Sequence, residues 1–431
     1  QTMKASDTGI KYAGEVEVVA IEVFSHKRER IDIAPQMIEL SIYEDIFTNT
    51  IHGTISISDS FDLIHNFPFI GEELINIKLK TPTMGEIGTV DYFGYVYKIS
   101  DRHYTTERGQ VYLIHFCSFE QIVDINKKVS KSFSGNISDL VEEIFKSEEF
   151  LASNKDLVLE KTANNIVFAS PFWNPLKTIN WLSVRALKKE NNSPTFVFYE
   201  TLNNKFNFVS LDSMYAQKPK EGIHYRYDNY VRMPTENGST RNLELDYGVI
   251  RDLYVEEVFD YANRSESGIY ASRLINTNLL SKTIKTTTHD YLESFSKTNH
   301  LGGFPVASPN LIRRRSSAIF SVTNNEFVYD GQRDFKVDQW FTQRKSLMGQ
   351  AYSVHKADIV VSGRFDLHAG DCVTMELAQK QAVNRGDGRE EIVNNYFSGK
   401  FLVGAIHHRI EGSTHNMIMQ CFTESLSKGL E

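Results

Sequence analysis

Hydrophobic and polar residues alternate with a period of two near the start of the chain. Three stretches share the pattern, and in each the apolar residues fall on one face: Ile38, Leu40 and Ile42 in 37–43, Ile55 and Ile57 in 53–60, and Ile75, Ile77 and Leu79 in 71–81. This period is typical of half-buried strands. Residues 15–33 also alternate, and a long hairpin is predicted from strands within 92–103 and 111–119. Strands at this spacing indicate a small β-barrel or sandwich.

The middle of the chain changes to helical and mixed patterns. The predicted elements are a helix at 136–145 with Asn136 as its N-cap, a helix at 170–189 with Pro175 in its first turn, an aromatic hairpin at 194–211 with an Asn-Asn turn, and a helix at 335–350. Over 220–335 there are strand-like pieces but no clean period.

Strands return in the last part of the chain. Residues 357–367 and 372–377 alternate, and a long polar loop then leads to a predicted hairpin at 396–425. The residues expected on one face of this hairpin are Phe401, Val403 and Ala405 on its first strand and Met417, Met419 and Cys421 on its second.

The hairpins at 92–121 and 396–425 share residues when they are aligned at a constant offset. The coincident pairs are Tyr92 and Tyr396, Phe93 and Phe397, His103 and His407, Glu107 and Glu411, Ile114 and Ile418, Cys117 and Cys421, and Glu120 and Glu424. In both copies a glycine and an acidic residue, Gly71–Glu72 or Gly370–Asp371, precede a strand, a loop and the hairpin. Because loops tolerate insertions while strands hold their register, this order indicates a duplicated barrel. The alternative is coincidence between two amphipathic hairpins.

The order of elements predicts a β-rich α+β fold in which a mixed α/β insertion separates two β-barrels. The predicted segments are a first barrel at 10–128, a helical α+β insertion at 129–225, a mixed α/β segment at 226–345 and a second barrel at 346–431. A length of 431 residues suggests several domains, and an aromatic content of 12% favours β-rich packing.

Charge and cysteine content narrow the function classes. A net charge of -8, from 47 Lys+Arg and 55 Asp+Glu, argues against a nucleic-acid-binding protein, which normally carries a basic excess. Cys117, Cys372 and Cys421 cannot all pair within the chain, which indicates synthesis in a reducing cytoplasm. No apolar run approaches the ~20 residues of a membrane helix, and no signal-peptide core is present, so we expect no stable membrane insertion.

No motif predicts an active site. The glycine motifs that bind phosphate and the HExxH zinc motif are absent, and the adjacent His407 and His408 should point to opposite faces of a strand. We therefore expect no catalytic, cofactor-binding or metal-binding residues and no enzyme activity. Weaker candidates are better explained as ordinary surface: SxxK at Ser294–Lys297, Ser353–Lys356 and Ser425–Lys428, the carboxylate pairs Glu142–Glu143 and Glu390–Glu391, the basic run 313–315, and the loop 386–390.

Three stretches carry a family resemblance. Residues 37–81 resemble an opening barrel, 170–204 a central helix with its aromatic hairpin, and the closing part, 363–377 with 397–422, a second barrel in which Val403 and His408 fit a Val-x-x-x-x-His pattern. The family with this order is the baseplate hub proteins of T-even-like contractile-tailed phages, which are related to the base of type VI secretion spike proteins. The resemblance implies two tail-tube-like barrels per chain and a homotrimer with pseudo-sixfold symmetry.

The same resemblance implies a place and a set of partners. The trimer would join the six-fold tail tube to the three-fold central spike in the virion baseplate, and genome DNA would pass through the ring without specific binding. No needle-like β-helix follows the second predicted barrel, so we expect the spike to be a separate chain. Further partners would be tail tube or tube-initiator proteins and other baseplate proteins. The acidic balance fits a wall to which DNA does not adhere.

Three other functions stay open at this stage. A tube initiator or another tube-related baseplate protein would need only one tube-like barrel. A cell-wall or polysaccharide hydrolase of the tail would need a carboxylate pair buried between the barrels. A host-binding module at the tail tip would bind glycans or cells as an isolated protein.

Overall fold

The computed structural model describes most of the chain. The described ranges are residues 12–67, 69–82, 84–106, 109–227, 246–257, 260–279, 282–307, 317–322, 337–353, 355–377 and 396–429.

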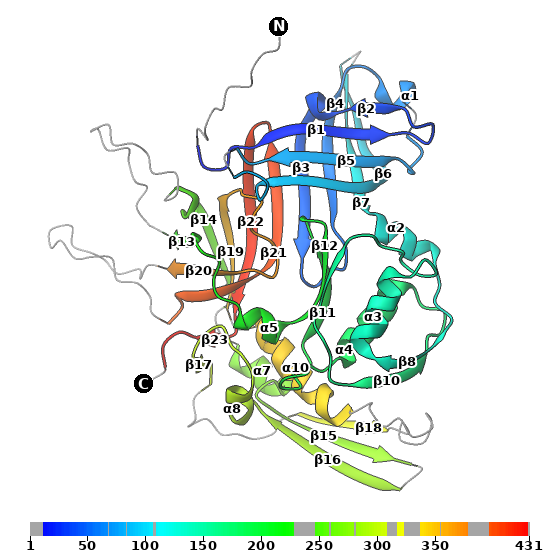
Figure 1. Ribbon diagram of the computed structural model, residues 1–431. Coiled ribbons are helices and arrows are strands. Elements are labelled where there is room, and N and C mark those ends of the chain that lie inside the picture. Colours follow the sequence, from blue (N-terminus) through cyan, green and yellow to red (C-terminus); the bar gives the residue numbers. More distant parts are fainter. Residues whose placement is uncertain are drawn as a thin grey trace, which may run out of the picture.

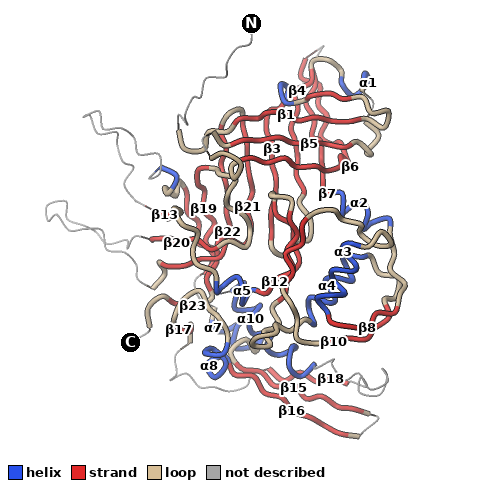
Figure 2. The backbone as a smooth tube through the Cα atoms, viewed as in Figure 1, coloured by secondary structure: helices blue, strands red, loops and turns tan. Residues whose placement is uncertain are grey.

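Strands dominate the described residues, and the helices are few (Figure 2). The strands are β1 Glu17–Phe24, β2 Arg30–Asp32, β3 Met37–Asp45, β4 His52–Asp59, β5 Leu74–Lys80, β6 Thr89–Thr106, β7 Gly109–Ser118, β8 Ser132–Asn136, β9 Asp156–Leu159, β10 Asn165–Ala169, β11 Phe196–Thr201, β12 Lys205–Ser210, β13 His224–Tyr227, β14 Asp252–Glu257, β15 Ala271–Asn278, β16 Thr283–Asp290, β17 Phe304–Pro305, β18 Ser317–Val322, β19 His355–Ser362, β20 Cys372–Leu377, β21 Gly399–Glu411, β22 Thr414–Thr423 and β23 Ser425–Leu426. The helices are α1 Leu63–Asn66, α2 Phe119–Asn126, α3 Ile137–Lys146, α4 Pro175–Arg185, α5 Leu211–Ala216, α7 Tyr261–Ser267, α8 Tyr291–Ser294 and α10 Val337–Ser353, with short 3-10 turns at Ala34–Gln36 and Phe295–Lys297. The prediction of a β-rich fold is therefore confirmed.

One large sheet contains strands from both the N-terminal and the C-terminal part of the chain (Figure 1). Among the described residues it contains thirteen strands, in the order β14-β19-β22-β21-β3-β4-β7-β6-β5-β1-β2, with β20 beside β21 and β13 beside β20. Strands from the first and the last quarter of the sequence thus lie side by side, because β3 pairs with β21.

The sheet consists of two repeats with the same topology. The first repeat has the strand order β3-β4-β7-β6-β5-β1, and the second has β14-β19-β22-β21-β20-β13. Corresponding strands also follow one another in the same order along the chain. The repeats differ at one end, where β1 is antiparallel to β5 but β13 is parallel to β20. Two of the strands, β13 and β14, come from the segment in which the sequence gives no clean period.

Neither predicted barrel is closed in the part of the chain that the structure describes. No strand ladder among the described residues pairs the two end strands of either repeat, although in the second repeat Arg226 of β13 forms an isolated parallel bridge with Val249, just before β14. Instead, β21 continues beyond the end of β20, and the backbone groups of its second half pair with β3. Backbone donors and acceptors on a buried edge require partners, so this overhang joins the repeats into one open sheet.

The buried residues of β7 and β22 show which positions of the two repeats correspond. The inward residues are Gln110, Tyr112, Ile114 and Phe116 on β7, and His415, Met417, Met419 and Cys421 on β22. The counterpart of Cys421 is therefore Phe116, and the constant-offset alignment of Cys117 with Cys421 is wrong by one residue. A shift of one residue along a strand moves each side chain to the other face of the sheet. The identical residues in the constant-offset alignment therefore do not occupy equivalent positions.

A β-bulge lies at the same place in both hairpins. The register shifts after Val96 in β6 and after Val403 in β21. Both valines donate their backbone N–H groups to carbonyl oxygens at 2.9 Å, Val96 to Glu73 and Val403 to Asp371. Val96 and Val403 are therefore structural counterparts.

Bulges also explain two wrong face assignments. Ala405 follows the bulge in β21, so the next buried position is Ile406 and not Ala405. Ile38 lies at a bulge between Met37 and Glu39 and is 46% exposed, whereas its predicted neighbours on that face are buried. An extra residue in one strand reverses the alternation, which the period of two does not anticipate.

The insertion follows its local sequence signals closely. The Asn136 side chain accepts a hydrogen bond from Ser138 N at 3.1 Å and caps α3, and Pro175 begins α4. Residues 196–210 form the predicted aromatic hairpin, β11 and β12, which pairs with β9. A separate core of aromatic and aliphatic side chains fills the space between α3, α4 and these strands.

Candidate functional site

The joint between the two repeats is formed by β3 and β21. Their registered pairs run from Glu39 opposite Glu411 to Asp45 opposite Ala405. Tyr43 of β3 stacks on His407 of β21, with ring centroids 4.5 Å apart. The joint therefore has backbone hydrogen bonds along its length and side-chain contacts across it.

A buried carboxylate, Glu44, links three parts of the molecule at this joint. Its Oε1 accepts a hydrogen bond from Leu202 N at 3.0 Å, and its Oε2 accepts one from Ala369 N at 2.9 Å. His368 Nδ1 lies 3.2 Å from Oε1, and His408 Nε2 lies 3.5 Å from the same atom. Glu44 thus holds the insertion and a loop of the second repeat against β3 of the first.

The environment of Glu44 favours its charged form. Burial alone would raise its pKa, but the charges and hydrogen bonds of His368 and His408 outweigh burial and hold the pKa of Glu44 well below its usual range. Burial opposes the charge of His368, but the Glu44 carboxylate outweighs it and raises the pKa of His368 above the ordinary 6.5. The two groups therefore form an ion pair.

We expect His368 to make the stability of the joint depend on pH. A raised histidine pKa stabilises the fold below about pH 6.5, and this stabilisation is lost as the pH rises through the raised value. The lowered pKa of Glu44 stabilises the fold above about pH 4.5. His368→Asn should therefore lower the free energy of unfolding by roughly 2 kcal/mol near about pH 6, as for a lost charge-assisted hydrogen bond, and by less at about pH 9. Urea unfolding of both proteins across this pH range measures the difference.

His407→Asn is the matched control for this measurement. Burial lowers the pKa of His407, so folding favours the neutral form of this side chain. The stability difference caused by His407→Asn should not shrink as the pH rises. A His368→Asn difference that is constant from pH 6 to pH 9 would contradict the proposed ion pair.

A second buried charge cluster joins the insertion to the first repeat. Glu200 Oε2 accepts hydrogen bonds from Ile51 N at 2.9 Å and from the Ser118 hydroxyl. Lys155 Nζ lies 2.5 Å from Glu200 Oε1 and 2.9 Å from Glu120 Oε2. Burial raises the pKa of Glu200, although the charge of Lys155 opposes this effect. The carboxylates of Glu200 and Glu120 in turn raise the pKa of Lys155.

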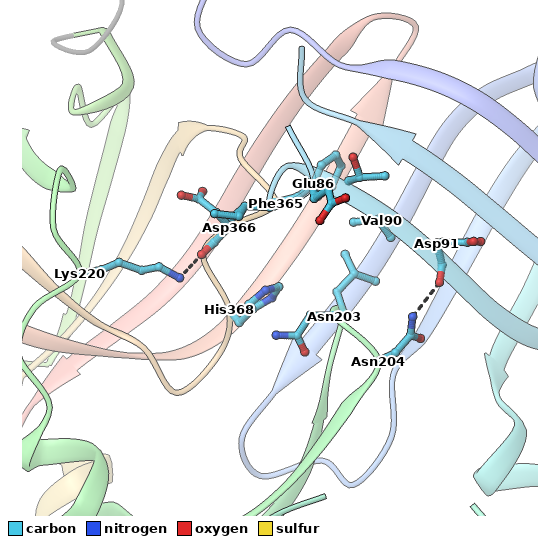
Figure 3. A pocket seen from close by; sticks show the side chains of 12 residues that line it. Glu86, Val90, Asp91, Asn203, Asn204, Lys220, Phe365, Asp366 and His368 are labelled. Atoms are coloured by element: carbon cyan, nitrogen blue, oxygen red, sulfur yellow. Dashed lines mark hydrogen bonds between the residues drawn. The ribbon is translucent and has the colours of Figure 1, made fainter. Parts of the chain in front are cut away.

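A cleft of about 450 Å³ opens where the same three parts meet (Figure 3). Its walls come from the segment 86–91, the turn between β11 and β12, Lys220, and the loop after β19. Polar links cross it: Asn204 donates to the Asp91 carbonyl at 2.7 Å, and Lys220 donates to the Asp366 carbonyl. The cleft therefore opens beside the contacts of Glu44, since Leu202 and His368 line it.

The weak sequence candidates that fall within the described ranges do not gather into a site. As predicted, His407 and His408 lie on opposite faces of β21: His407 bonds to Ser41 Oγ at 2.9 Å, while His408 is buried beside Glu44. The alignment of His103 with His407 is wrong. Because of the bulges, the residue of the first repeat that corresponds to His407 is Ser100.

The acidic candidates that the structure describes lie on the surface of α3. Glu143 pairs with Lys131 at 2.7 Å on the surface of α3, and Glu142 is exposed. The run 313–315, the loop 386–390 and Glu391 lie outside the described residues. Among the residues that the structure does describe, no cluster of His, Cys, Asp or Glu could hold a metal ion, and the three cysteines are free and buried.

Sequence reasoning missed Glu44, His368 and Glu200. One signal was available for Glu44, since it follows Leu40 and Ile42 at the next inward position of the same strand. A carboxylate on an inward face requires buried partners. No local pattern indicates that these partners lie in the second repeat and in the insertion.

Helices in the described ranges lack the combined length and apolar character of a membrane span. No protein-family model and no curated protein matches the sequence.

Solved structures show a clear likeness of fold. A tail protein from Neisseria meningitidis MC58 has a TM-score of 0.52 at 9% identity, over 93% of this chain and 95% of that chain. A 43 kDa tail protein of prophage MuSo2 from Shewanella oneidensis has a TM-score of 0.50 at 10% identity, over 94% and 98% of the two chains. A prophage tail protein from Listeria monocytogenes EGD-e has a TM-score of 0.50 at 9% identity, over 94% and 95%. The chain therefore has the fold of phage tail proteins.

Proposed function

We propose that this chain is a structural, non-enzymatic protein of a phage tail, and that it forms the trimeric baseplate hub. The observation that carries the proposal is the presence of two repeats with one strand order, joined edge to edge in a single sheet. Two repeats per chain and three chains give six similar units around an axis. Such a ring matches a six-fold tube on one side and a three-fold spike on the other.

The proposed partners follow from this geometry. They are a separate spike chain, the tail tube or a tube initiator, and other baseplate proteins, with DNA passing through the ring. The proposed location is the tail baseplate of the virion, after synthesis in the host cytoplasm. A net charge of -8 supports passage of DNA without adhesion.

We propose a division of the chain at residues 128, 225 and 345, in which two strands from outside 346–431 are added to the second unit. Under it, 10–128 and 346–431 are the two tube-like units, and 129–225 and 226–345 are the intervening segments. The strands β13 and β14 precede residue 346 but pair with β20 and β19, so they belong with the second unit. We propose that each unit has a tube-like, barrel-like form in the assembled ring.

The experiment is a mass and symmetry measurement on the purified full chain. Light scattering coupled to size exclusion should give three copies per particle at high protein concentration, and negative-stain electron microscopy should show three-fold rings with six lobes. Repeating both with candidate spike proteins covers a hub that assembles only around its spike. Particles that stay monomeric or adopt another symmetry under all of these conditions would overturn the hub. Turnover of cell-wall polysaccharide or binding of host glycans by the purified chain would favour the other functions.

A further inference from the structure

Two of the sheet edges that have no strand partner among the described residues belong to β14 and β6. One is the outer edge of β14, the strand at the end of the sheet path (Figure 1). The other is the edge of β6 beyond Tyr95, where β5 ends and only β7 continues alongside. Free edges carry unpaired N–H and C=O groups and are natural sites for adding a strand from another chain.

These two edges are the counterparts of the two edges that form the joint. In the shared strand order, β14 corresponds to β3, and β6 corresponds to β21. The joint pairs the first strand of one repeat, β3, with the overhang of the hairpin strand β21 of the other repeat. The second repeat offers the same first strand, and the first repeat offers the same overhang, but within one chain they do not meet.

The register of the internal joint can be carried over position by position. From the inward residues of β7 and β22, His103 corresponds to Arg409, and Tyr104 to Ile410. From the pairings with β4 and β19, Tyr254 corresponds to Ser41.

In the joint, Ser41 lies opposite Arg409, and Leu40, the counterpart of Leu253, lies opposite Ile410. Carried to the free edges, Tyr254 comes to lie opposite His103. Leu253 likewise comes to lie opposite Tyr104.

The chemistry of the two edges is complementary. The strand β14 has the sequence DLYVEE, with three acidic residues, and the overhang of β6 carries Lys98, Arg102 and His103 against one acidic residue, Asp101. Large side chains on both edges face solvent: Tyr254 is 63% exposed and Tyr104 is 75% exposed. Opposite charges and aromatic pairs across antiparallel strands stabilise the pairing, and exposed edge aromatics are typical of a surface that becomes covered.

We propose that β14 of one chain pairs antiparallel with the β6 overhang of a second copy, with Tyr254 opposite His103, and so repeats between chains the joint that β3 and β21 make within a chain. This inference rests on the proposed function for the number of copies, because the ring of three chains is part of the proposed hub. The partner is a second copy of this chain, and the contact is heterologous, which closes into a ring when the rotation divides a full turn.

Cysteine cross-linking of the full chain tests the register. His103→Cys and Tyr254→Cys in one chain should give covalent dimers and trimers under mild oxidation on a denaturing gel, because opposed residues of antiparallel strands lie within disulfide range. Each single variant alone should stay a monomer on that gel, and an equimolar mixture of the two should give dimers only. The pair Ser41→Cys and Arg409→Cys is the matched control, since it should cross-link within one chain without a change of mass.

The outcomes separate this inference from the hub itself. A native trimer that does not cross-link at His103 and Tyr254, while the Ser41 and Arg409 pair closes, would overturn the edge pairing and leave the hub standing. A protein that is monomeric with and without spike candidates, and also gives no cross-link, would overturn both. Cross-linking that never proceeds beyond two copies, or that continues to four or more, would keep the edge pairing and overturn the trimer.

A charge variant provides a second, independent readout. Lys98→Glu with Arg102→Glu places acidic residues opposite the acidic β14 and should weaken self-association about tenfold at low salt, with a smaller effect at high salt. Lys161→Glu, a surface change in the insertion, should leave association unchanged. Equal association of the Lys98 and Arg102 variant and the native chain would contradict the proposed edges.

Discussion

Replacement of Glu44 by alanine should lower the free energy of unfolding by about 3–5 kcal/mol, as for a buried ion pair that loses one partner. The change leaves two buried backbone donors, Leu202 N and Ala369 N, without their acceptor. It also leaves His368 charged in a buried place without its counter-ion, or forces it to lose its proton. Each of these losses is costly because the Glu44 side chain is fully buried, and buried polar groups that lose a partner keep the cost of their desolvation.

Two measurements check the Glu44 prediction. Urea unfolding followed by circular dichroism gives the loss of stability, and hydrogen exchange should show faster exchange at the amides of Leu202 and Ala369. Glu44→Gln is the matched variant, since it keeps an acceptor oxygen without the charge and should cost less. Unchanged protection of both amides in Glu44→Ala would show that the carboxylate does not hold the three parts together.

Replacement of Lys155 by methionine should destabilise the protein by a similar amount, about 3–5 kcal/mol at neutral pH. Methionine fills nearly the same space but leaves Glu200 and Glu120 buried without the cation between them. With Lys155 gone, the carboxylates have to take up a proton, so the loss should be smaller at about pH 4.5 than at about pH 7.

The control for Lys155 is a lysine whose Nζ lies at a similar distance from a carboxylate oxygen but is exposed to solvent. Lys161 lies 2.9 Å from Asp139, yet both side chains are more than half exposed. Lys161→Met should therefore change the free energy of unfolding by less than about 1 kcal/mol. Equal effects of the two substitutions would mean that burial does not set the strength of the Lys155 cluster.

Local patterns predicted most of the individual elements. The strands β4 and β5, the helices α3 and α4, and the hairpin of β11 and β12 form where periodicity and capping residues indicate. The exceptions have local causes that the pattern does not contain. A bulge at Ile38 separates this residue from the buried face of Leu40, and a bulge at Gly404 makes Ile406, not Ala405, the next buried residue. In the segment 220–335 the strands β13 and β14 form because they pair with β20 and β19, not because their own sequences alternate.

The sequence by itself determined that the chain is β-rich, that a similar hairpin occurs near each end, and that a helical insertion separates them, because periodicity and capping act over a few residues. The tertiary structure alone decided the register between the repeats, the joint of β3 with β21, and the partners of Glu44. These depend on backbone and side-chain groups that are distant along the chain, such as Glu44 and His368, and burial makes their pairing obligatory only after the sheet has formed.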